Sequence, residues 1–397
     1  MNAQYSPQDA VAWPGWPDDE PELNEELDPS ITDYATYLAI LRKPERQWAK
    51  IQPWLQIQGY MLRPRFRPGW TPSWKGGKTQ NEFSTIGRED AVPHDFIYAD
   101  VTIDAIRTSD GLHVCLKRIP CRAEDSHEVS LMEFLSRPEQ RKDPRNHAIP
   151  LLDVIRAPDH CFLVLPFQRA LLSLEDSFNT AGEGLDLIYQ TLEGLAYLHE
   201  LRIAHRDFSP GNILMDANRV YPRGFHFDNA NVDARGRFLS GVRTRTQVGG
   251  VRYYLIDFGE SMRFGASDSV LIDVWSKACT HAPETVGQDR PPYDPFKADI
   301  YTAGETYRRM LIKDYEGYFN MLLPLIDSMT ATDPDTRPTA HEALQQFANI
   351  QASYSRTALH ARVRRTVSTR ETSLTRAFAN GWHWTKQFAF AVRNFKW

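Results

Sequence analysis

The sequence predicts an α+β fold with two parts, a smaller strand-rich part followed by a larger helical part. Two segments near residue 100, DVTIDAI and HVCLKRI, alternate apolar and polar residues, as half-buried strands do. An SDG turn separates them, so we expect an antiparallel hairpin. After residue 180, LDLIYQTLEGLAYLHE carries its leucines on one helical stripe, and more helical segments follow. Strands first and helices afterwards indicate an α+β arrangement.

Residues 1–90 are expected to form an N-terminal extension that is partly disordered. Residues 1–35 are rich in proline and acidic side chains, a composition that disfavours a packed core. Residues 36–60 have helical patterning. The stretch RPRFRPGWTPSW then contains too many prolines for a long helix or a central strand. We expect it to pack against the strand-rich part.

We expect the strand-rich lobe at residues 91–167 and the helical lobe at residues 168–350. In the first lobe the hairpin is followed by a helix in HEVSLMEFL and by strands in LLDVI and CFLVLPF. In the second lobe further helices are expected in KADIYTAGETYRRMLI, YFNMLLPLIDSM and RPTAHEALQQF. Thr339 and Glu342 have the spacing of a capping box at the start of the last helix.

Charge is distributed unevenly along the chain. The net charge is −5 over 397 residues, but the last 47 residues carry +8 and the preceding body carries −13. This balance gives no reason to expect a nucleic-acid partner. The tail, residues 351–397, combines basic and aromatic side chains. It could form an interfacial helix at an anionic surface, or it could dock its aromatic residues on the acidic body of the chain, which is the favoured interpretation.

The cysteines and the start of the chain bear on the cellular compartment. Four cysteines without CxxC spacing form no disulfide framework, so we expect reduced thiols in an intracellular protein, cytoplasmic or nuclear. The first residues lack the basic and apolar regions of a secretory signal, and no apolar run is long enough to span a membrane. No Cys/His cluster suggests a metal site of that kind.

The strongest functional signal is a pair of motifs, HRDFSPGN at residues 205–212 and DFG at residues 257–259. The probability that their seven fixed residues occur by chance is on the order of 10⁻⁵. A carboxylate such as Asp207 can accept the proton of a hydroxyl group. The carboxylate of Asp257 and the amide oxygen of Asn212 are hard ligands that suit Mg²⁺.

These motifs resemble the catalytic loop and the metal-binding loop of the eukaryotic protein kinases. The resemblance implies a two-lobed protein-kinase-like fold, with a small antiparallel β-rich N-lobe and a larger helical C-lobe, and ATP and Mg²⁺ as cofactors. It also implies that Asp207 is the catalytic base with Arg206 beside it, and that Asp257 and Asn212 hold the metal. With its RPRFRPGWTPSWK block and YYLIDFG strand, the chain looks most like the fungal protein-kinase-like proteins.

Residues of the first lobe match further positions of the family. Lys117 matches the strand lysine that contacts the α- and β-phosphates, and Glu128 matches the helix glutamate that pairs with it. LVLPFQ resembles the hinge that binds adenine. There Leu165 would be the gatekeeper, the carbonyl of Pro166 would accept a hydrogen bond, and the N–H of Gln168 would donate one.

Residues of the second lobe match the structural positions of the family. The APE motif at residues 282–284 matches the end of the activation segment. Asp299 and Gly304 match the central helix, and Arg337 matches the arginine that pairs with the APE glutamate. These matches imply a complete C-lobe.

Three features depart from the family pattern. The stretch before the strand lysine, HDFIYAD, has no glycine, and it carries Asp95 and Asp100 near the expected position of the phosphates. Ser209 stands where the family has a lysine near the γ-phosphate. The two metal-ligand motifs are 45 residues apart, and the excess lies in an insertion within residues 213–256. We interpret the insertion as a solvated loop, or else as a surface that shapes the acceptor site.

The leading hypothesis is an ATP- and Mg²⁺-dependent kinase of Ser/Thr hydroxyls in an unidentified protein substrate, with weak or slow activity. The matching catalytic and metal residues favour it. The missing glycines and Ser209 favour a pseudokinase that acts as a scaffold and binds nucleotide poorly. The loop without a lysine also fits a small-molecule kinase. Ser276 and Thr280 are candidate sites of activating phosphorylation.

Overall fold

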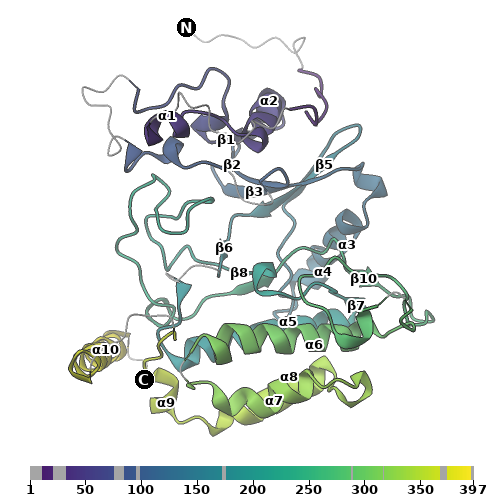
Figure 1. Cartoon of the computed structure of the whole chain (residues 1–397), viewed down its shortest axis with the longest axis vertical. Coiled ribbons are helices and arrows are strands. Elements are labelled where there is room, and N and C mark those ends of the chain that lie inside the picture. Colours follow the sequence, from purple (N-terminus) through teal and green to yellow (C-terminus); the bar gives the residue numbers. More distant parts are fainter. Residues whose placement is uncertain are drawn as a thin grey trace. The chain divides into compact units, whose positions relative to one another are not determined.

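The computed structural model describes residues 11–20, 33–75, 85–94, 99–171, 176–287, 289–315, 317–366 and 373–394. The chain divides into two units, and their helices and strands are labelled in Figure 1. Unit 1 contains Met1–Ser136, Pro150–Arg169 and Tyr221–Val242, and unit 2 contains Arg137–Ile149, Ala170–Val220 and Arg243–Trp397. The chain therefore leaves unit 1 and returns to it twice.

A five-stranded antiparallel sheet forms the centre of unit 1. Its strands are β1 (Tyr60–Leu62), β2 (Thr102–Arg107), β3 (His113–Ile119), β4 (Asp153–Arg156) and β5 (Cys161–Pro166). Their spatial order is β1-β2-β3-β5-β4. The hairpin expected from the sequence is β2–β3, and Gly111 in its turn has φ +74°, which glycine adopts without strain. The edge strand β1 ends before the first proline of the proline-rich stretch.

The pairing register gives the sheet two different faces. Leu116 on β3 lies opposite Val164 on β5, and both side chains are fully buried. Lys117 and its partner Leu163 point to the other face, because successive residues of a strand alternate. The first face packs on α2 (Lys43–Ile57) in one continuous core.

The N-terminal extension covers this first face. It contains α1 (Tyr34–Leu38) and α2, in the segment where helical patterning is expected. Trp48 on α2 is fully buried, and the ring of Trp16 lies 5.0 Å from it. The composition of residues 1–35 disfavours a packed core, but the buried indole of Trp16 anchors residues 11–20. We expected the first lobe at 91–167. Unit 1 contains most of these residues together with the extension and residues 221–242, whereas residues 137–149 belong to unit 2.

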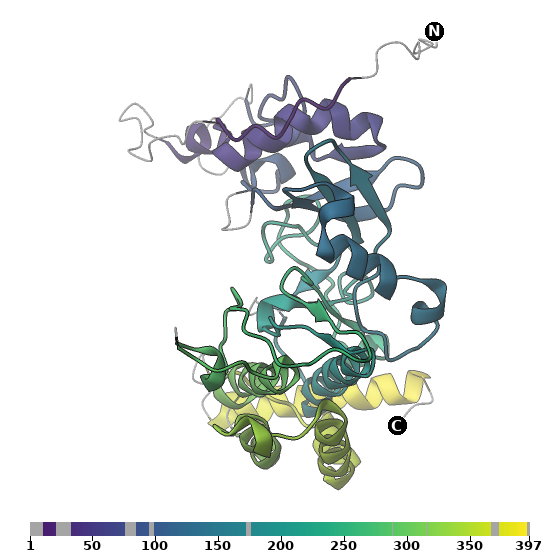
Figure 2. The ribbon, with the colours of Figure 1, turned by 90° about the vertical axis from the view of Figure 1, so that its right-hand side faces the viewer.

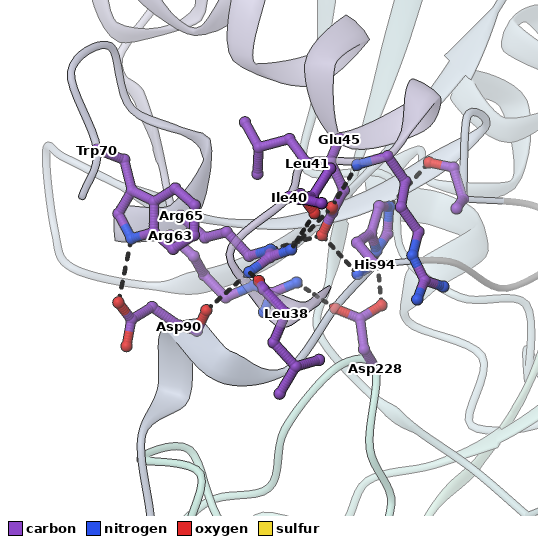
Figure 3. Close-up of polar contacts among 12 residues, drawn as sticks. Leu38, Ile40, Leu41, Glu45, Arg63, Arg65, Trp70, Asp90, His94 and Asp228 are labelled. Carbon is purple, nitrogen blue, oxygen red and sulfur yellow. Dashed lines mark hydrogen bonds and ion pairs between the residues drawn. The ribbon is translucent and has the colours of Figure 1, made fainter. Parts of the chain in front are cut away.

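A buried arginine fixes the proline-rich stretch to α2. Arg65 Nε and Nη2 donate to the two carboxylate oxygens of Glu45 at 2.6 and 3.0 Å, and both side chains are fully buried. The remaining donors of Arg65 reach the carbonyl oxygens of Leu38, Ile40 and Asp90 (Figure 3). Every N–H that the guanidinium directs into the core thus has an acceptor. The expected packing of this stretch on the first lobe is confirmed.

Unit 2 is mainly helical. Its helices are α4 (Pro138–Arg141), α5 (Ala181–Glu200), α6 (Pro295–Tyr307), α7 (Leu323–Met329), α8 (Ala340–Ser353), α9 (Arg356–His360) and α10 (Ser373–Asn394). Two short antiparallel pairs, β7 (Ile203–Ala204) with β10 (Met262–Arg263) and β8 (Ile213–Met215) with β9 (Tyr253–Leu255), hold its loops. A two-residue strand, β6 (Arg169–Ala170), lies where the chain passes from unit 1 to unit 2.

Local sequence signals account for the ends and packing of these helices. The capping box expected at Thr339 and Glu342 is present at the start of α8. A Cβ atom on Gly304 would lie 2.6 Å from Thr330 Cγ2, so the close packing of α6 at this point requires glycine. Among the described residues, no helix is long and apolar enough to cross a membrane.

Arg65→Met should lower the free energy of unfolding by about 3–5 kcal/mol, because it leaves the buried carboxylate of Glu45 without its partner. Urea unfolding followed by circular dichroism measures the change. Arg107→Met is the matched control, since Arg107 pairs with Asp110 at the surface, and the unfolding midpoint should hardly move. Equal shifts for both variants would contradict the structural role of Arg65.

Candidate active site

Antiparallel pairing in unit 2 brings the two sequence motifs together. The HRDFSPGN loop runs from β7 to β8, and the DFG segment follows β9. Because Ile213 on β8 lies opposite Leu255 on β9, the end of the first motif lies beside the start of the second. The N–H of Ile256 also donates to the carbonyl of Asn212 at 3.0 Å.

Two donors hold the carboxylate of Asp207. Asn212 Nδ2 donates to Asp207 Oδ2 at 2.8 Å, and the N–H of Cys279 donates to Oδ1 at 3.2 Å. Asn212 Nδ2 also donates to the backbone carbonyl of Asp207 at 2.9 Å. With both protons of its amide nitrogen used in this way, Asn212 keeps its amide oxygen available as a ligand.

The carboxyl group of Asp207 is set up to bind a proton. Burial is the largest influence, and it raises the pKa of Asp207 above its ordinary value. The negative charge of Asp257 raises this pKa further, while the hydrogen bonds from Cys279 and Asn212 oppose the shift. A carboxylate with a raised pKa is a better base than an exposed aspartate.

Both motifs contain a non-glycine residue with left-handed backbone geometry. Arg206 has φ +65° and Asp257 has φ +62°, a conformation that costs roughly 1–2 kcal/mol for a residue with a Cβ atom. Asp299 on α6 supports the first of these, because its carboxylate accepts the N–H groups of His205 and Arg206, both at 2.7 Å. Strain held by such support is typical of functional loops.

The donor groups of this loop pair fit a magnesium ion. Asp257 offers a carboxylate and Asn212 offers an amide oxygen, and Mg²⁺ prefers hard oxygen ligands. Asp257 is half-buried, and its Oδ1 accepts the N–H of Gly259 at 3.3 Å. These are the two residues that the sequence assigned to the metal.

Arg206 holds the segment that follows the DFG motif. Its guanidinium donates to the carbonyl oxygens of Glu260 and Val274, both at 2.9 Å. Ser276 donates in turn from its hydroxyl to the carbonyl of Arg206 at 3.1 Å, and its side chain is buried. Ser276 could therefore be phosphorylated only after local opening of this segment.

An ion pair joins the APE motif to Arg337, which lies shortly before α8. Arg337, which is fully buried, donates to both carboxylate oxygens of Glu284 at 2.6 and 2.8 Å. A fork-to-fork pair of this kind fixes orientation as well as position. The pair joins the activation segment to the residues before α8.

In unit 1, the strand lysine forms an ion pair with the first glutamate of α3 (His127–Leu135). Lys117 Nζ lies 2.6 Å from Glu128 Oε1, and both side chains are largely buried. The second glutamate of this helix, Glu133, instead pairs with Arg156 at 3.0 Å in an exposed position. The sheet face that carries Lys117 is thus the face that α3 approaches.

The segment that resembles the hinge, LVLPFQ, covers the end of β5 and the residues that follow it. Leu165 lies opposite Cys115, two residues before the lysine, and its side chain is buried. Pro166 ends the strand. Gln168 is half-buried, and its enclosed Oε1 atom has no hydrogen-bond partner among the described residues.

The insertion packs on this hinge instead of remaining a solvated loop. The ring of Phe167 lies 4.2 Å from that of His113 and 4.7 Å from that of Phe225. Arg169 donates to the carbonyl of Ala230 at 2.8 Å and stacks over the ring of Tyr221. The favoured interpretation of a solvated loop is wrong for the part of the insertion around Tyr221 and Phe225, because both rings are buried within unit 1, whereas Phe238 is 73% exposed.

A charged cluster also joins the insertion to the N-terminal extension. Arg63 donates to Asp104 Oδ1 at 2.7 Å. Arg63 also donates to Asp228, whose other carboxylate oxygen lies 2.6 Å from His94 Nδ1 (Figure 3). Sequence reasoning missed this cluster. The only sequence signal is an aspartate in an aromatic context, FHFDN, at residues 225–229.

One of the two aspartates that the sequence analysis expected near the phosphates, Asp100, already has a cationic partner. Asp100 pairs with Arg118, which donates to its carboxylate at 3.1 Å and to its carbonyl at 2.9 Å. Its charge is therefore partly neutralised. Asp95 lies outside the described residues. Lys117 lies on β3, the third strand in chain order. The first two strands, β1 and β2, are connected by the long segment 63–101.

Comparison with known proteins gives one family. The family model of the protein kinase domain matches residues 98–347, more than half of the chain. A probable serine/threonine-protein kinase of Dictyostelium discoideum is 27% identical over 59% of this chain and 46% of its own length. A probable serine/threonine-protein kinase described as an MRK1 homolog, from Encephalitozoon cuniculi, is 35% identical over 31% of this chain and 33% of its own.

A third relative is the serine/threonine-protein kinase PLK1 of Xenopus laevis, which is 26% identical over 52% of this chain and 33% of its own length. The chain thus spans less than half the length of each of these three relatives.

Asp207→Asn should stabilise unit 2 at neutral pH. The raised folded-state pKa means that folding disfavours the ionised carboxylate, and this penalty is fully present above the folded pKa. The penalty disappears as the pH falls below the unfolded pKa, near 3.8, where the group is protonated in both states.

Thermal unfolding of both proteins between pH 7 and pH 4 measures this difference. The variant should melt higher at pH 7, and the gap should narrow as the pH falls. Asp335→Asn, at an exposed position, is the control and should change neither value. A variant that melts lower than wild type at pH 7 would show that the carboxylate stabilises the loop.

Proposed function

The chain belongs to the protein kinase family, and on that premise we propose that it transfers the γ-phosphoryl group of ATP to a Ser or Thr hydroxyl of a protein substrate. The observation that carries this proposal is the hydrogen bond between Asp207 and Asn212. Asp299 supports the backbone of this loop by accepting the N–H of Arg206. This arrangement provides a positioned base and leaves an amide oxygen for metal. The relatives' printed names, all serine/threonine-protein kinases, support the choice of acceptor.

Each side chain has a separate part in the proposed reaction. Asp207 orients the acceptor hydroxyl and takes its proton. Lys117, held by Glu128, contacts the α- and β-phosphates, and the carbonyl of Pro166 and the N–H of Gln168 bind adenine. Asp257 and Asn212 would hold Mg²⁺, which neutralises phosphate charge when bound.

A pseudokinase is the second candidate, and specific observations favour it. The segment 63–101 stands between the first two strands, where the family resemblance implies a Gly-rich loop. Its residues Arg63 and Arg65 are already engaged in buried ion pairs. Ser209, in place of a lysine, is buried. These features reduce the contacts available to the phosphates, so we propose weak or slow transfer rather than none.

Asp207→Asn should abolish phosphotransfer and leave nucleotide binding nearly unchanged, because the amide keeps the shape of the carboxylate but takes no proton. Transfer from labelled ATP to a panel of generic protein substrates, with and without Mg²⁺, measures the first effect. Asp216→Asn, after β8, is the matched control and should retain the wild-type rate. Equal residual transfer by wild type and Asp207→Asn would favour the scaffold.

ATP–Mg²⁺ should bind weakly, with a Kd on the order of 100 μM or higher. The loss of one or two backbone hydrogen bonds to charged phosphate oxygens costs about 1.5–3 kcal/mol each, which is roughly one to four orders of magnitude in affinity. Lys117→Ala should remove the remaining binding, whereas Lys50→Ala, on the exposed side of α2, should not.

Isothermal titration with ATP in the presence and absence of Mg²⁺ decides between the two candidates. Metal-dependent, weak binding agrees with a slow kinase. Low-micromolar binding would show that the glycine-free stretch HDFIYAD, at the end of segment 63–101, still holds the phosphates. Absence of binding at millimolar ATP would identify the scaffold.

A further inference from the structure

The C-terminal helix α10 exposes its apolar side chains to solvent. Leu374, Phe378, Trp382, Phe388 and Val392 are each at least 59% exposed. At 100° per residue, these five positions fall within an arc of about 120° around the helix axis. They therefore form an apolar stripe along the helix, which Gly381 and Thr385 interrupt near its middle. Figure 2 shows the ribbon of this helix lengthwise, in yellow.

The opposite side of α10 holds the helix on unit 2. His383 Nε2 donates to the carbonyl of His360 at 2.8 Å, and Arg362 donates to Asn380 Oδ1 at 3.5 Å. Gln387, on the same side, is only 7% exposed. Polar side chains thus make these contacts. The favoured interpretation, in which the aromatic residues of the tail dock on the body, is wrong for Phe378 and Trp382.

This orientation needs an explanation, because water is a poor environment for a row of aromatic and aliphatic side chains. Soluble monomers rarely expose large contiguous apolar patches, and those that they expose usually mark interaction sites. The stripe spans about 27 Å from Leu374 to Val392, at 1.5 Å per residue. A surface of this shape suits a flat or shallow apolar partner.

The charge of α10 identifies the kind of partner. The helix contains Arg376, Lys386 and Arg393 and no acidic residue. Lys386 lies on the edge of the stripe, with its ammonium group 5.3 Å from the centre of the Trp382 ring. A cationic helix with an aromatic, apolar stripe matches an anionic lipid surface, which offers negative headgroups beside apolar chains.

We propose that α10 binds an anionic membrane surface, with its apolar stripe inserted at the level of the headgroups and its polar side still on unit 2. The helix would lie in the plane of the membrane, since no described helix is apolar enough to span one. The partner is the lipid itself. The proposed site places unit 2 at the membrane and is independent of phosphotransfer.

Sedimentation of the full-length chain with lipid vesicles tests this proposal. One set of vesicles is phosphatidylcholine alone, and the other contains about 30% phosphatidylserine, in about 0.1 M salt. Each cation near an anionic surface contributes about fivefold, so three cations predict about hundredfold stronger binding to the anionic vesicles. Raising the salt to about 0.5 M should remove most of this preference.

A test variant and a matched control distinguish binding through the stripe from non-specific binding through any exposed aromatic side chain. Phe378→Ser combined with Trp382→Ser should weaken binding to anionic vesicles by at least about tenfold. Phe238→Ser removes a comparably exposed aromatic residue in the insertion and should leave binding unchanged. Equal thermal unfolding midpoints of all three proteins confirm that the variants are folded.

Several outcomes would overturn the proposal. They are the absence of vesicle binding, equal binding to neutral and anionic vesicles, and unchanged binding by the double variant. Concentration-dependent self-association that the double variant abolishes, without vesicle binding, would assign the stripe to a second copy of the chain instead.

Discussion

The carboxylate of Asp299, almost fully buried on α6, determines the shape of the catalytic loop. It accepts the backbone N–H groups of His205 and Arg206, and His199 lies 3.0 Å from the same carboxylate. A buried charge needs several donors to offset its lost hydration. Here two of those donors are backbone N–H groups of the HRDFSPGN loop, so the hydrogen bonds that satisfy the charge also order the loop. The left-handed backbone of Arg206 is held in this way, and Asp207 is presented next to it.

Unit 1 uses apolar burial on one sheet face and ion pairs on the other. The N-terminal extension packs indoles against the first face, which leaves Lys117 and Leu165 on the second face with α3 and the hinge. Buried arginines then join distant segments, and each one has carboxylate and carbonyl acceptors. Such clusters set orientation more than they add stability, because desolvation offsets much of the attraction.

The insertion changes the surroundings of the segment that follows β5, although it lies between the two motifs in sequence. Residues 221–242 belong to unit 1, although their flanking residues belong to unit 2. Phe225 stacks on the hinge residue Phe167, and Asp228 joins Arg63 beside β2. Residues of the insertion, which lies between the HRDFSPGN and DFG motifs in sequence, thus pack against Phe167 after β5.

The sequence by itself determined the two-part α+β order, the hairpin, the catalytic loop and the DFG segment, because these depend on local patterns and on fixed residue types. It also indicated Lys117 and Glu128, which one strand and the next helix bring together. Only the tertiary structure decided that Asp228 meets Arg63, since 165 residues separate them and no local pattern encodes that contact. The same holds for α10. An amphipathic pattern shows that a helix has two faces, but the surrounding contacts decide which face meets the rest of the protein, and in α10 it is the polar face, through His383 and the buried Gln387.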